Sequence, residues 1–379
     1  MNTNRLSIFK GIATMLTVAA ALAPFRAMAQ SPATFTVYAT GLNGPRGLEF
    51  GPDGTLYVAE AGTAGTNSTV GQCPQVGAPA GPYVAGRTAR ILKVTKSGTL
   101  TPVAGGFPSG QNGFGDIQGV ADIAFLQGQM YALVAGGGCS HGDATIPAGI
   151  AKVDLTTGNW TMIANLSTFL QQHPARYISP GDWEADGSFY SMVATNGLLY
   201  AVEPNHGQIV SISPRGGVDL VMDVSSSEGH IVPTAIESSR GNFYVGNLGG
   251  FPIAPGTQKI LALAKQRGYF GLAPGFDVEN DRVRIVDSRA GFTTVVSIKM
   301  GPDGLLYVLE LSSAAGFPSP GAGKVVRLRW SGEIEDVVTG LVVPTAMTFG
   351  PDGALYISNF GAAPAGAGQI LRFSIPHAF

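Results

Sequence analysis

Short hydrophobic runs are the main pattern along this chain. They are rich in β-branched and aromatic residues, and most are bounded by Gly or Pro. Such runs predict β-strands, whereas helices would need long stretches with a 3.6-residue period, which the sequence lacks. We therefore expect an all-β protein.

A strand with a central tyrosine recurs six times, at Tyr57, Tyr131, Tyr200, Tyr244, Tyr307 and Tyr356. A candidate first strand precedes each tyrosine, beginning at Pro45, Val120, Tyr190, Pro233, Val295 and Pro344. A candidate third strand follows each, beginning at Ala89, Gly149, Gly207, Gln258, Gly323 and Gly368. Repeats of this kind, spaced by roughly 45 residues plus inserted loops, predict a six-bladed β-propeller. We number the blades one to six in the order of their tyrosines.

Three copies of Gly-Pro-Asp-Gly, at 51–54, 301–304 and 350–353, lie between a first strand and a tyrosine strand. Proline presets φ at the first central position of a tight turn, aspartate suits the second, and the closing glycine accepts a left-handed conformation. Each copy therefore predicts a hairpin.

The ends of the repeat predict how the ring closes. Fourth strands are visible in blades one, two, three and five, the fourth blade's is obscured by an insertion at 265–282, and the sixth blade has none. Segment 35–50 matches segment 333–349, which begins with the outer strand of blade five. We therefore expect the first strand to complete blade six, which removes a free sheet edge. Two β-sandwich domains are the alternative that short, regularly spaced strands leave open.

The first residues have the composition of a secretory signal. Arg5 and Lys10 precede an apolar stretch at 11–23, and Ala27-Met28-Ala29 follows it. We expect cleavage after Ala29, leaving one domain at 30–379. The apolar stretch is too short to span a membrane, and no later run of about 18 apolar residues occurs. A periplasmic or secreted monomer without a membrane span is the expectation.

Composition narrows the class of partner. Without Arg5, Lys10 and Arg26, 20 of the 23 basic residues remain against 25 acidic ones, a formal charge of −5. Nucleic-acid binding needs a basic face, so we expect none. A small molecule or a protein is the partner that we expect.

Function in a propeller is sought at the channel mouth, where the loops between second and third strands and those between blades gather. Cys73 and Cys139 fall in such loops of blades one and two. Two cysteines in an exported protein predict a disulfide. Two small buried thiols are the alternative.

Polar residues recur three positions after the anchor tyrosine, where Val134 alone breaks the pattern: Glu60, Glu203, Asn247, Glu310 and Asn359. They could face a ligand or Ca²⁺, which prefers oxygen ligands. They could instead accept hydrogen bonds from the backbone of adjoining loops. Because the pattern repeats in nearly every blade, we favour the structural interpretation.

Three residues break the symmetry of the first strands and are therefore candidates for binding. They are Arg46, Asp122 and Tyr190. The first strands of blades four and six instead have threonine near their starts, at Thr234 and Thr345. An arginine at the mouth can hold a carboxylate or phosphate through two hydrogen bonds. Alternatively, Arg46 pairs structurally with Asp122 or Glu60.

Other motifs lack the context that their chemistry needs. Segment 138–142 matches G-x-S-x-G, but a strand rather than a helix is expected after it. Asp277, Glu279 and Asp281 begin like a calcium loop, yet Arg282 stands where glycine is required. The five histidines show no zinc-ligand spacing, and no metal site is assigned.

The motif GLxxPRGLxFGPDGxLYVAEAG at 41–62, with VADIAF at 120–125 and LLYVLE at 305–310, resembles the ScyD/ScyE family of exported propellers with NHL-like repeats. The resemblance runs along essentially the whole mature chain. It implies the propeller fold, export and an extracytoplasmic role around a small molecule, and it carries no agreed set of catalytic residues. Blade three departs from the pattern at 203–206.

Two classes of function stay open at this point. A binding module, as in NHL-repeat propellers, is preferred because no constellation of acid, base and electrophile can be assembled. The alternative is an enzyme, either a Ca²⁺-dependent hydrolase or lactonase or a quinoprotein-like sugar dehydrogenase. The residues near the start of the first strands are largely uncharged, which suits a calcium cage poorly: Arg46, Ala121, Tyr190, Thr234, Val296 and Thr345.

Overall fold

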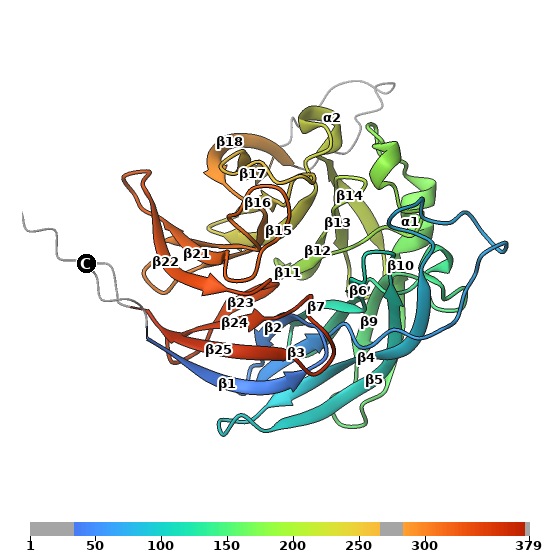
Figure 1. Ribbon diagram of the computed structural model, residues 1–379, viewed down its shortest axis with the longest axis horizontal. Coiled ribbons are helices and arrows are strands. Elements are labelled where there is room, and N and C mark those ends of the chain that lie inside the picture. Colours follow the sequence, from blue (N-terminus) through green and yellow to red (C-terminus); the bar gives the residue numbers. More distant parts are fainter. Residues whose placement is uncertain (1–33, 266–282, 376–379) are drawn as a thin grey trace, which may run out of the picture. The chain divides into compact units, whose positions relative to one another are not determined.

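The computed structural model describes residues 34–265 and 283–375. The chain divides into two units, Met1–Ser31 and Pro32–Phe379, and the described residues lie in the second. Within this unit six antiparallel sheets are arranged as the six blades of a β-propeller (Figure 1). The predicted all-β class and the six blades are confirmed, and two β-sandwich domains are excluded.

The first three blades follow the chain in order. Blade one consists of β2 (Pro45–Phe50), β3 (Leu56–Glu60), β4 (Val84–Val94), β5 (Leu100–Gln111) and β6 (Ile117–Gln118). Blade two consists of β7 (Val120–Leu126), β8 (Gln129–Val134), β9 (Gly149–Val153) and β10 (Trp160–Asn165). Blade three consists of β11 (Ser191–Thr195), β12 (Leu198–Glu203), β13 (Gln208–Ile212) and β14 (Val218–Asp223).

The last three blades complete the ring. Blade four consists of β15 (Pro233–Ser239), β16 (Asn242–Asn247), β17 (Gln258–Lys265) and β18 (Val283–Phe292). Blade five consists of β19 (Val295–Met300), β20 (Leu306–Glu310), β21 (Gly323–Leu328) and β22 (Ile334–Leu341). Blade six consists of β23 (Ala346–Phe349), β24 (Leu355–Asn359), β25 (Gly368–Ser374) and, from the start of the chain, β1 (Thr34–Leu42).

Strand β1 closes the ring as the sequence predicts. It pairs antiparallel with β25, with Phe35 opposite Phe373 and Val37 opposite Leu371. Each first strand also contacts the first strands of both neighbouring blades, and this contact continues around the ring from β2 to β23 and back to β2. The first strands therefore enclose a central channel.

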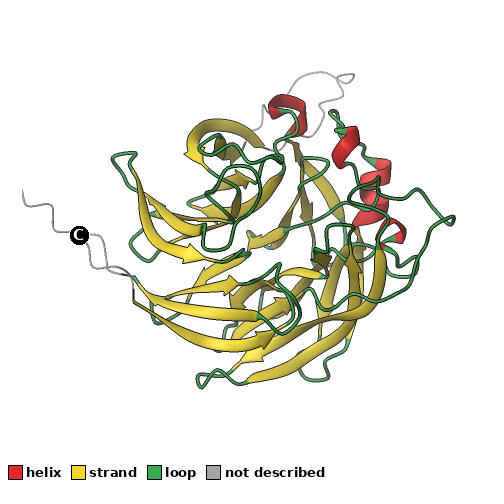
Figure 2. Ribbon diagram, viewed as in Figure 1, coloured by secondary structure: helices red, strands yellow, loops and turns green. Residues whose placement is uncertain are grey.

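Helices are short and few in the described part of the chain (Figure 2). They are α1 (Leu166–Gln172), α2 (Ser225–Glu228) and the 3₁₀ turns η1 (Cys139–His141) and η2 (Pro180–Asp182). Asn165 begins α1 as its N-cap, because its side chain accepts a hydrogen bond from the amide of Thr168 at 2.8 Å. None of the described helices is long and apolar enough to cross a membrane.

The Gly-Pro-Asp-Gly segments form the predicted hairpins. In blade one, Gly51 N donates to Thr55 O at 2.8 Å, and Gly54 has a φ of +75°, which favours glycine. In blade five the turn aspartate also accepts a hydrogen bond from its anchor tyrosine, from Tyr307 Oη to Asp303 Oδ2 at 2.9 Å. The turn and the tyrosine are therefore parts of one unit.

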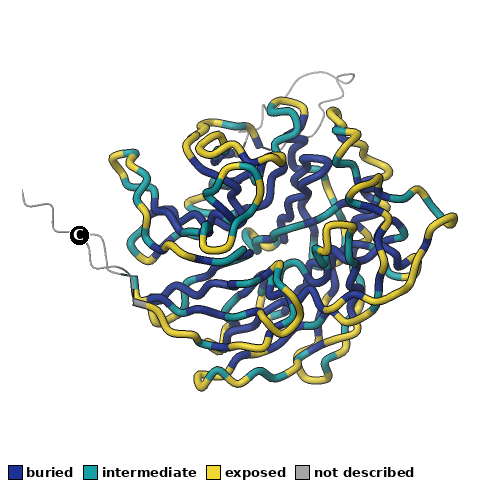
Figure 3. Tube along the Cα trace, in the orientation of Figure 1, coloured by how far each residue is buried: buried dark blue, intermediate teal, exposed yellow. Residues whose placement is uncertain are grey.

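The anchor tyrosines fill the space between neighbouring blades. Tyr57 packs on Phe125 of the next blade, with ring centroids 5.4 Å apart, and Tyr356 packs edge-on against Phe50 at 5.0 Å. Buried residues follow the strands and exposed ones the turns (Figure 3). The hydrophobic core is thus divided into layers between the blades.

Three details differ from the sequence expectation or lie outside it. Strand β11 begins at Ser191 instead of Tyr190, and β23 begins at Ala346 instead of Pro344. The obscured outer strand of blade four is β18, which the structure places directly after the insertion. The calcium-loop residues Asp277, Glu279 and Asp281 lie outside the described residues.

Candidate functional site

The polar residues at the ends of the second strands accept hydrogen bonds from backbone amides of their own blades, from the entering segment in four cases and from β17 in the case of Asn247. Each is buried and accepts a backbone hydrogen bond. The donors and acceptors are Asn43 N to Glu60 Oε1 (2.7 Å), Ser188 N to Glu203 Oε1 (2.7 Å), Lys259 N to Asn247 Oδ1 (2.9 Å), Thr293 N to Glu310 Oε1 (2.9 Å) and Val342 N to Asn359 Oδ1 (2.8 Å). These are the contacts that the structural interpretation expected.

Glu310 keeps one oxygen without a hydrogen bond in the described part of the chain. Its Oε2 lies 3.8 Å from Lys324 Nζ. Burial raises the pKa of Glu310 to about 7, and Lys324 only partly opposes this rise.

The disulfide between Cys73 and Cys139 is present, with a Cα–Cα distance of 6.3 Å. It joins the β3–β4 loop of blade one to the β8–β9 loop of blade two. The prediction of a disulfide is confirmed, and the alternative of two buried thiols is wrong.

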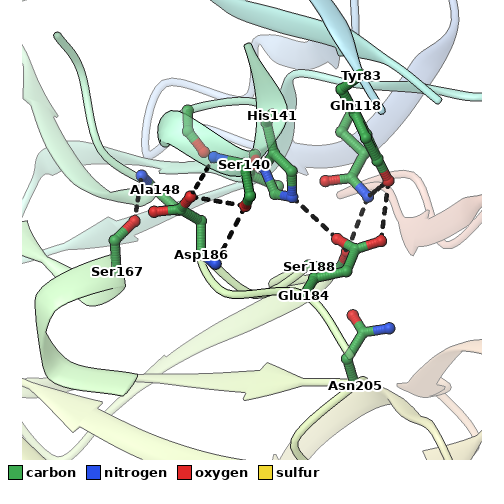
Figure 4. A network of polar contacts seen from close by, with 12 residues as sticks. Tyr83, Gln118, Ser140, His141, Ala148, Ser167, Glu184, Asp186, Ser188 and Asn205 are labelled. Atoms are coloured by element: carbon green, nitrogen blue, oxygen red, sulfur yellow. Dashed lines mark hydrogen bonds and ion pairs between the residues drawn. The ribbon is translucent and has the colours of Figure 1, made fainter. Parts of the chain in front are cut away.

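A buried polar network lies beside this disulfide and joins the loops of blades one, two and three (Figure 4). Glu184, from the segment before β11, accepts a hydrogen bond from Tyr83 Oη at 2.9 Å and lies 2.9 Å from His141 Nε2. Gln118 on β6 donates to Tyr83 Oη at 3.0 Å and to Ser188 Oγ at 2.7 Å. The network and the disulfide together hold the loops of these three blades in place.

The surroundings of His141 determine its protonation. Its Nδ1 lies 2.9 Å from the carbonyl oxygen of Gly137, and its Nε2 faces the Glu184 carboxylate. Both neighbours are acceptors, so both ring nitrogens carry hydrogen when Glu184 is ionised. Burial alone would lower the pKa of His141, but Glu184 raises it above its usual value. Burial would raise the pKa of Glu184, but His141 lowers it.

The G-x-S-x-G match does not form a nucleophile. Ser140 is buried, and its Oγ donates to Asp186 Oδ2 at 2.7 Å instead of to a histidine base. Its segment leads into β9 and not into a helix. The rejection of this motif is therefore confirmed.

Arg46 lies at the channel mouth and is paired with a residue that sequence reasoning did not identify. Its Nη2 donates to Asp116 Oδ1 at 2.8 Å and to the carbonyl oxygen of Ile117 at 2.6 Å. The proposed pairing with Asp122 or Glu60 is wrong, because Glu60 instead pairs with Arg90. Burial would lower the pKa of Arg46, but Asp116 and then Tyr190 raise it.

Tyr190 crosses the channel. Its hydroxyl donates to the carbonyl oxygen of Thr345 at 3.3 Å, and Thr345 immediately precedes the first strand of blade six, opposite blade three in the ring. Burial raises the pKa of Tyr190 to about 12. Side chains of opposite blades therefore meet at the mouth.

Asp122 links the first strands of blades two and three. Its Oδ2 accepts a hydrogen bond from Met192 N at 2.8 Å. Burial raises the pKa of Asp122 to about 7, against the opposing effect of Lys299. A Cβ added to Gly47 on β2 would lie 1.9 Å from Asp122 Oδ1, so the close packing of the first strands of blades one and two requires glycine there.

Six buried side-chain oxygens have no hydrogen-bond partner in the described part of the protein, and two of them belong to neighbours in sequence of residues at the Arg46 site. These two are Gln118 Oε1 and Ser191 Oγ. Gln118 follows the residue whose carbonyl binds Arg46, and Ser191 follows Tyr190. Sequence reasoning missed both. Gln118 belongs to no repeated position or motif, and Ser191 is a small polar residue on an expected first strand, as Thr234 and Thr345 are on theirs.

Sequence reasoning also missed three charged residues deeper in the channel. Glu49, Glu237 and Lys299 occupy the fifth position of their expected first strands, where the other blades have Ala124, Ala194 and Thr348. Comparing the fifth position across all six copies would have found them.

The described residues do not form a calcium site of the kind that the alternative function needs. Among residues 34–265 and 283–375, no three His, Cys, Asp or Glu side chains gather so that they could hold a metal ion. The repeated Glu and Asn side chains are instead occupied by backbone amides.

Comparisons with known proteins support the fold. No family model matches the chain, and no curated protein matches its sequence. A gluconolactonase from Xanthomonas campestris is 12% identical, with a TM-score of 0.53 over 91% of this chain and 90% of that one. The PQQ-bound aldose sugar dehydrogenase of Streptomyces coelicolor is 14% identical, with a TM-score of 0.54 over 91% and 98%. Regucalcin, a calcium-binding protein from Agrobacterium tumefaciens, is 13% identical, with a TM-score of 0.53 over 92% and 96%. At these identities the likeness concerns the fold alone.

Proposed function

We propose that this chain is an exported binding propeller of the ScyD/ScyE type that binds a small polar molecule at its loop-capped channel mouth. The observation that carries the proposal is the pair of buried oxygens without partners on Gln118 and Ser191, which directly follow Ile117, an acceptor for Arg46, and Tyr190 in the sequence. Buried polar atoms in proteins almost always have a partner. A bound molecule with hydrogen-bond donors would supply it.

The geometry of Gln118 supports this role. Its amide nitrogen donates both hydrogens, one to Tyr83 and one to Ser188, so the orientation of the amide is fixed. Its oxygen is left as an acceptor at a defined place. An unsatisfied buried acceptor costs about 1–3 kcal/mol, which a ligand donor would recover.

Arg46 adds a preference for anionic or aromatic molecules. Its partner Asp116 is 41% exposed and belongs to the β5–β6 hairpin, whereas the Arg46 side chain is only 12% exposed. A ligand carboxylate could displace Asp116 and take over the hydrogen bond to the guanidinium. Tyr190 offers an aromatic surface beside it.

The disulfide supports export, because disulfides persist in oxidising compartments outside the cytoplasm. A protein partner is the second kind of ligand that this surface could take. The enzymatic alternatives are supported by the shared fold alone, and fold does not determine activity.

The test is a thermal-shift screen with aromatic carboxylates, starting from 4-hydroxybenzoate, followed by titration of any molecule that raises the melting temperature. We expect Arg46→Ala to weaken binding about tenfold or more and Asp116→Asn to strengthen it, because Arg46 is then no longer neutralised. Arg215→Ala, at an exposed turn, is the matched control. Unchanged affinity in Arg46→Ala would refute the proposed site.

A further inference from the structure

A second candidate site lies at the other end of the channel. A cavity of about 280 Å³ opens where the first strands run into their hairpins, and all six of these strands line it. At about 30 Å³ per molecule, it has the volume of about nine waters. It can therefore hold a small organic molecule.

The charged groups of the cavity form a loose triad. Lys299 Nζ lies 3.7 Å from Glu49 Oε2 and 3.8 Å from Glu237 Oε2. Both distances exceed those of direct N–H···O hydrogen bonds, about 2.7–3.2 Å. The ammonium thus lies between two carboxylates without a close bond to either.

When both carboxylates are ionised, the triad leaves one negative charge uncompensated; burial raises the pKa of Glu237, and Lys299 opposes this rise. Two carboxylates and one ammonium have a net charge of −1, and the side chains are only 34% (Glu49), 12% (Glu237) and 23% (Lys299) exposed. Asp122 also acts on Lys299 and adds negative charge when it is ionised. A poorly solvated negative charge is costly unless it is paired.

The surface of the cavity is mainly polar. Apolar side chains, both aromatic and sulfur-containing, together with smaller aliphatic ones, also line it. The larger ones are Phe125, Met192, Met300 and Phe349. Phenylalanine rings attract cations, so Phe125 and Phe349 offer a surface for the organic part of a cationic ligand.

We propose that this cavity binds a small organic monocation, whose ammonium group lies between Glu49 and Glu237 on the side away from Lys299. The two carboxylates and the two cations then alternate in sign, and the site becomes neutral. The apolar body of the ligand packs on Phe125 and Phe349. An anionic ligand would be repelled by the net charge, and a neutral one would leave that charge uncompensated.

Three probes of similar size test whether the cavity prefers a cation to a neutral molecule or an anion. They are benzylammonium, benzyl alcohol and benzoate. Isothermal titration or ligand-observed NMR should detect saturable binding of benzylammonium and much weaker binding of the other two. The absence of saturable binding by benzylammonium at millimolar concentrations would overturn the proposal, as would equal binding of benzoate.

Five variants place the site. We expect Glu49→Gln and Glu237→Gln to weaken benzylammonium binding about tenfold or more each, while Glu333→Gln, the same change at an exposed turn, leaves it unaltered. Lys299→Met should preserve or strengthen binding, because it makes the cavity more negative. A loss of binding in Lys299→Met, with the fold intact by circular dichroism, would contradict the proposal. Arg46→Ala should have no effect, which separates this site from the channel mouth.

Discussion

The imidazole Nε2 of His141 lies 2.9 Å from Oε2 of Glu184, and both side chains are buried between the loops of blades one, two and three. The pair joins a loop of blade two to the segment that enters blade three. Because each partner shifts the pKa of the other toward the charged form, the contact connects the stability of these loops to pH.

The first prediction concerns that pH dependence. Because the pKa of His141 is raised in the folded protein, its charged form stabilises the folded state. This stabilisation is complete below pH 6.5, the pKa of His141 in the unfolded chain, and it is lost as pH rises through the pKa in the folded protein. The lowered pKa of Glu184 likewise stabilises the folded state. This stabilisation is complete above pH 4.5, the pKa of Glu184 in the unfolded chain, and it is lost as pH falls through the pKa in the folded protein. The difference in unfolding free energy between the unsubstituted protein and His141→Gln should therefore be largest between pH 4.5 and pH 6.5.

Urea unfolding at a series of pH values measures this difference, which should reach about 3 kcal/mol on the plateau. His173→Gln, a histidine change at an exposed position, serves as the control. A difference that does not vary with pH would show that the pair is not ionised in the folded protein.

A second prediction concerns the disulfide. Cys73 and Cys139 are 66 residues apart in the sequence, and a loop of this length stabilises the folded state by about 4 kcal/mol in the chain-entropy model. Reductant should lower the unfolding midpoint of the protein but not that of the double variant Cys73→Ser/Cys139→Ser. Thiol labelling of the denatured, unreduced protein should find no free cysteine.

A third prediction concerns the contact between blades one and two. Gly47→Ala should destabilise the protein by about 1–3 kcal/mol, because the new Cβ would meet Asp122 Oδ1. Gly250→Ala is the control, since nothing lies within 4 Å of its added Cβ. Equal denaturant midpoints for the two variants would be incompatible with the close packing of Gly47 on Asp122.

A fourth prediction separates the binding function from calcium-dependent catalysis. If the repeated Glu and Asn side chains only bind backbone amides, a chelator should leave the melting temperature unchanged. Added calcium should not raise it either. Stoichiometric calcium in the purified protein, together with a chelator-induced fall in melting temperature, would favour the enzymatic alternative.

Much of the candidate site could not be predicted from the sequence. Arg46 was found because it breaks the symmetry of the first strands, but its partner Asp116 lies 70 residues away in a hairpin without any motif. Glu49, Glu237 and Lys299 looked like ordinary polar residues on strands. Nothing local indicates that residues from blades one, four and five face one another across the channel.

The blades follow from the amino-acid sequence, because strand alternation, tight turns and the tyrosine repeat are properties of neighbouring residues, and the closure of the ring follows from the match between segments 35–50 and 333–349. The packing of the blades determines which polar groups of different blades meet. Tyr190 contacts the carbonyl of Thr345 across 155 residues, and Thr345 Oγ1 contacts that of Pro45 across 300. Such contacts depend on how six sheets pack around one axis. The sequence pattern predicts each sheet separately, but it does not specify which side chains of different sheets meet.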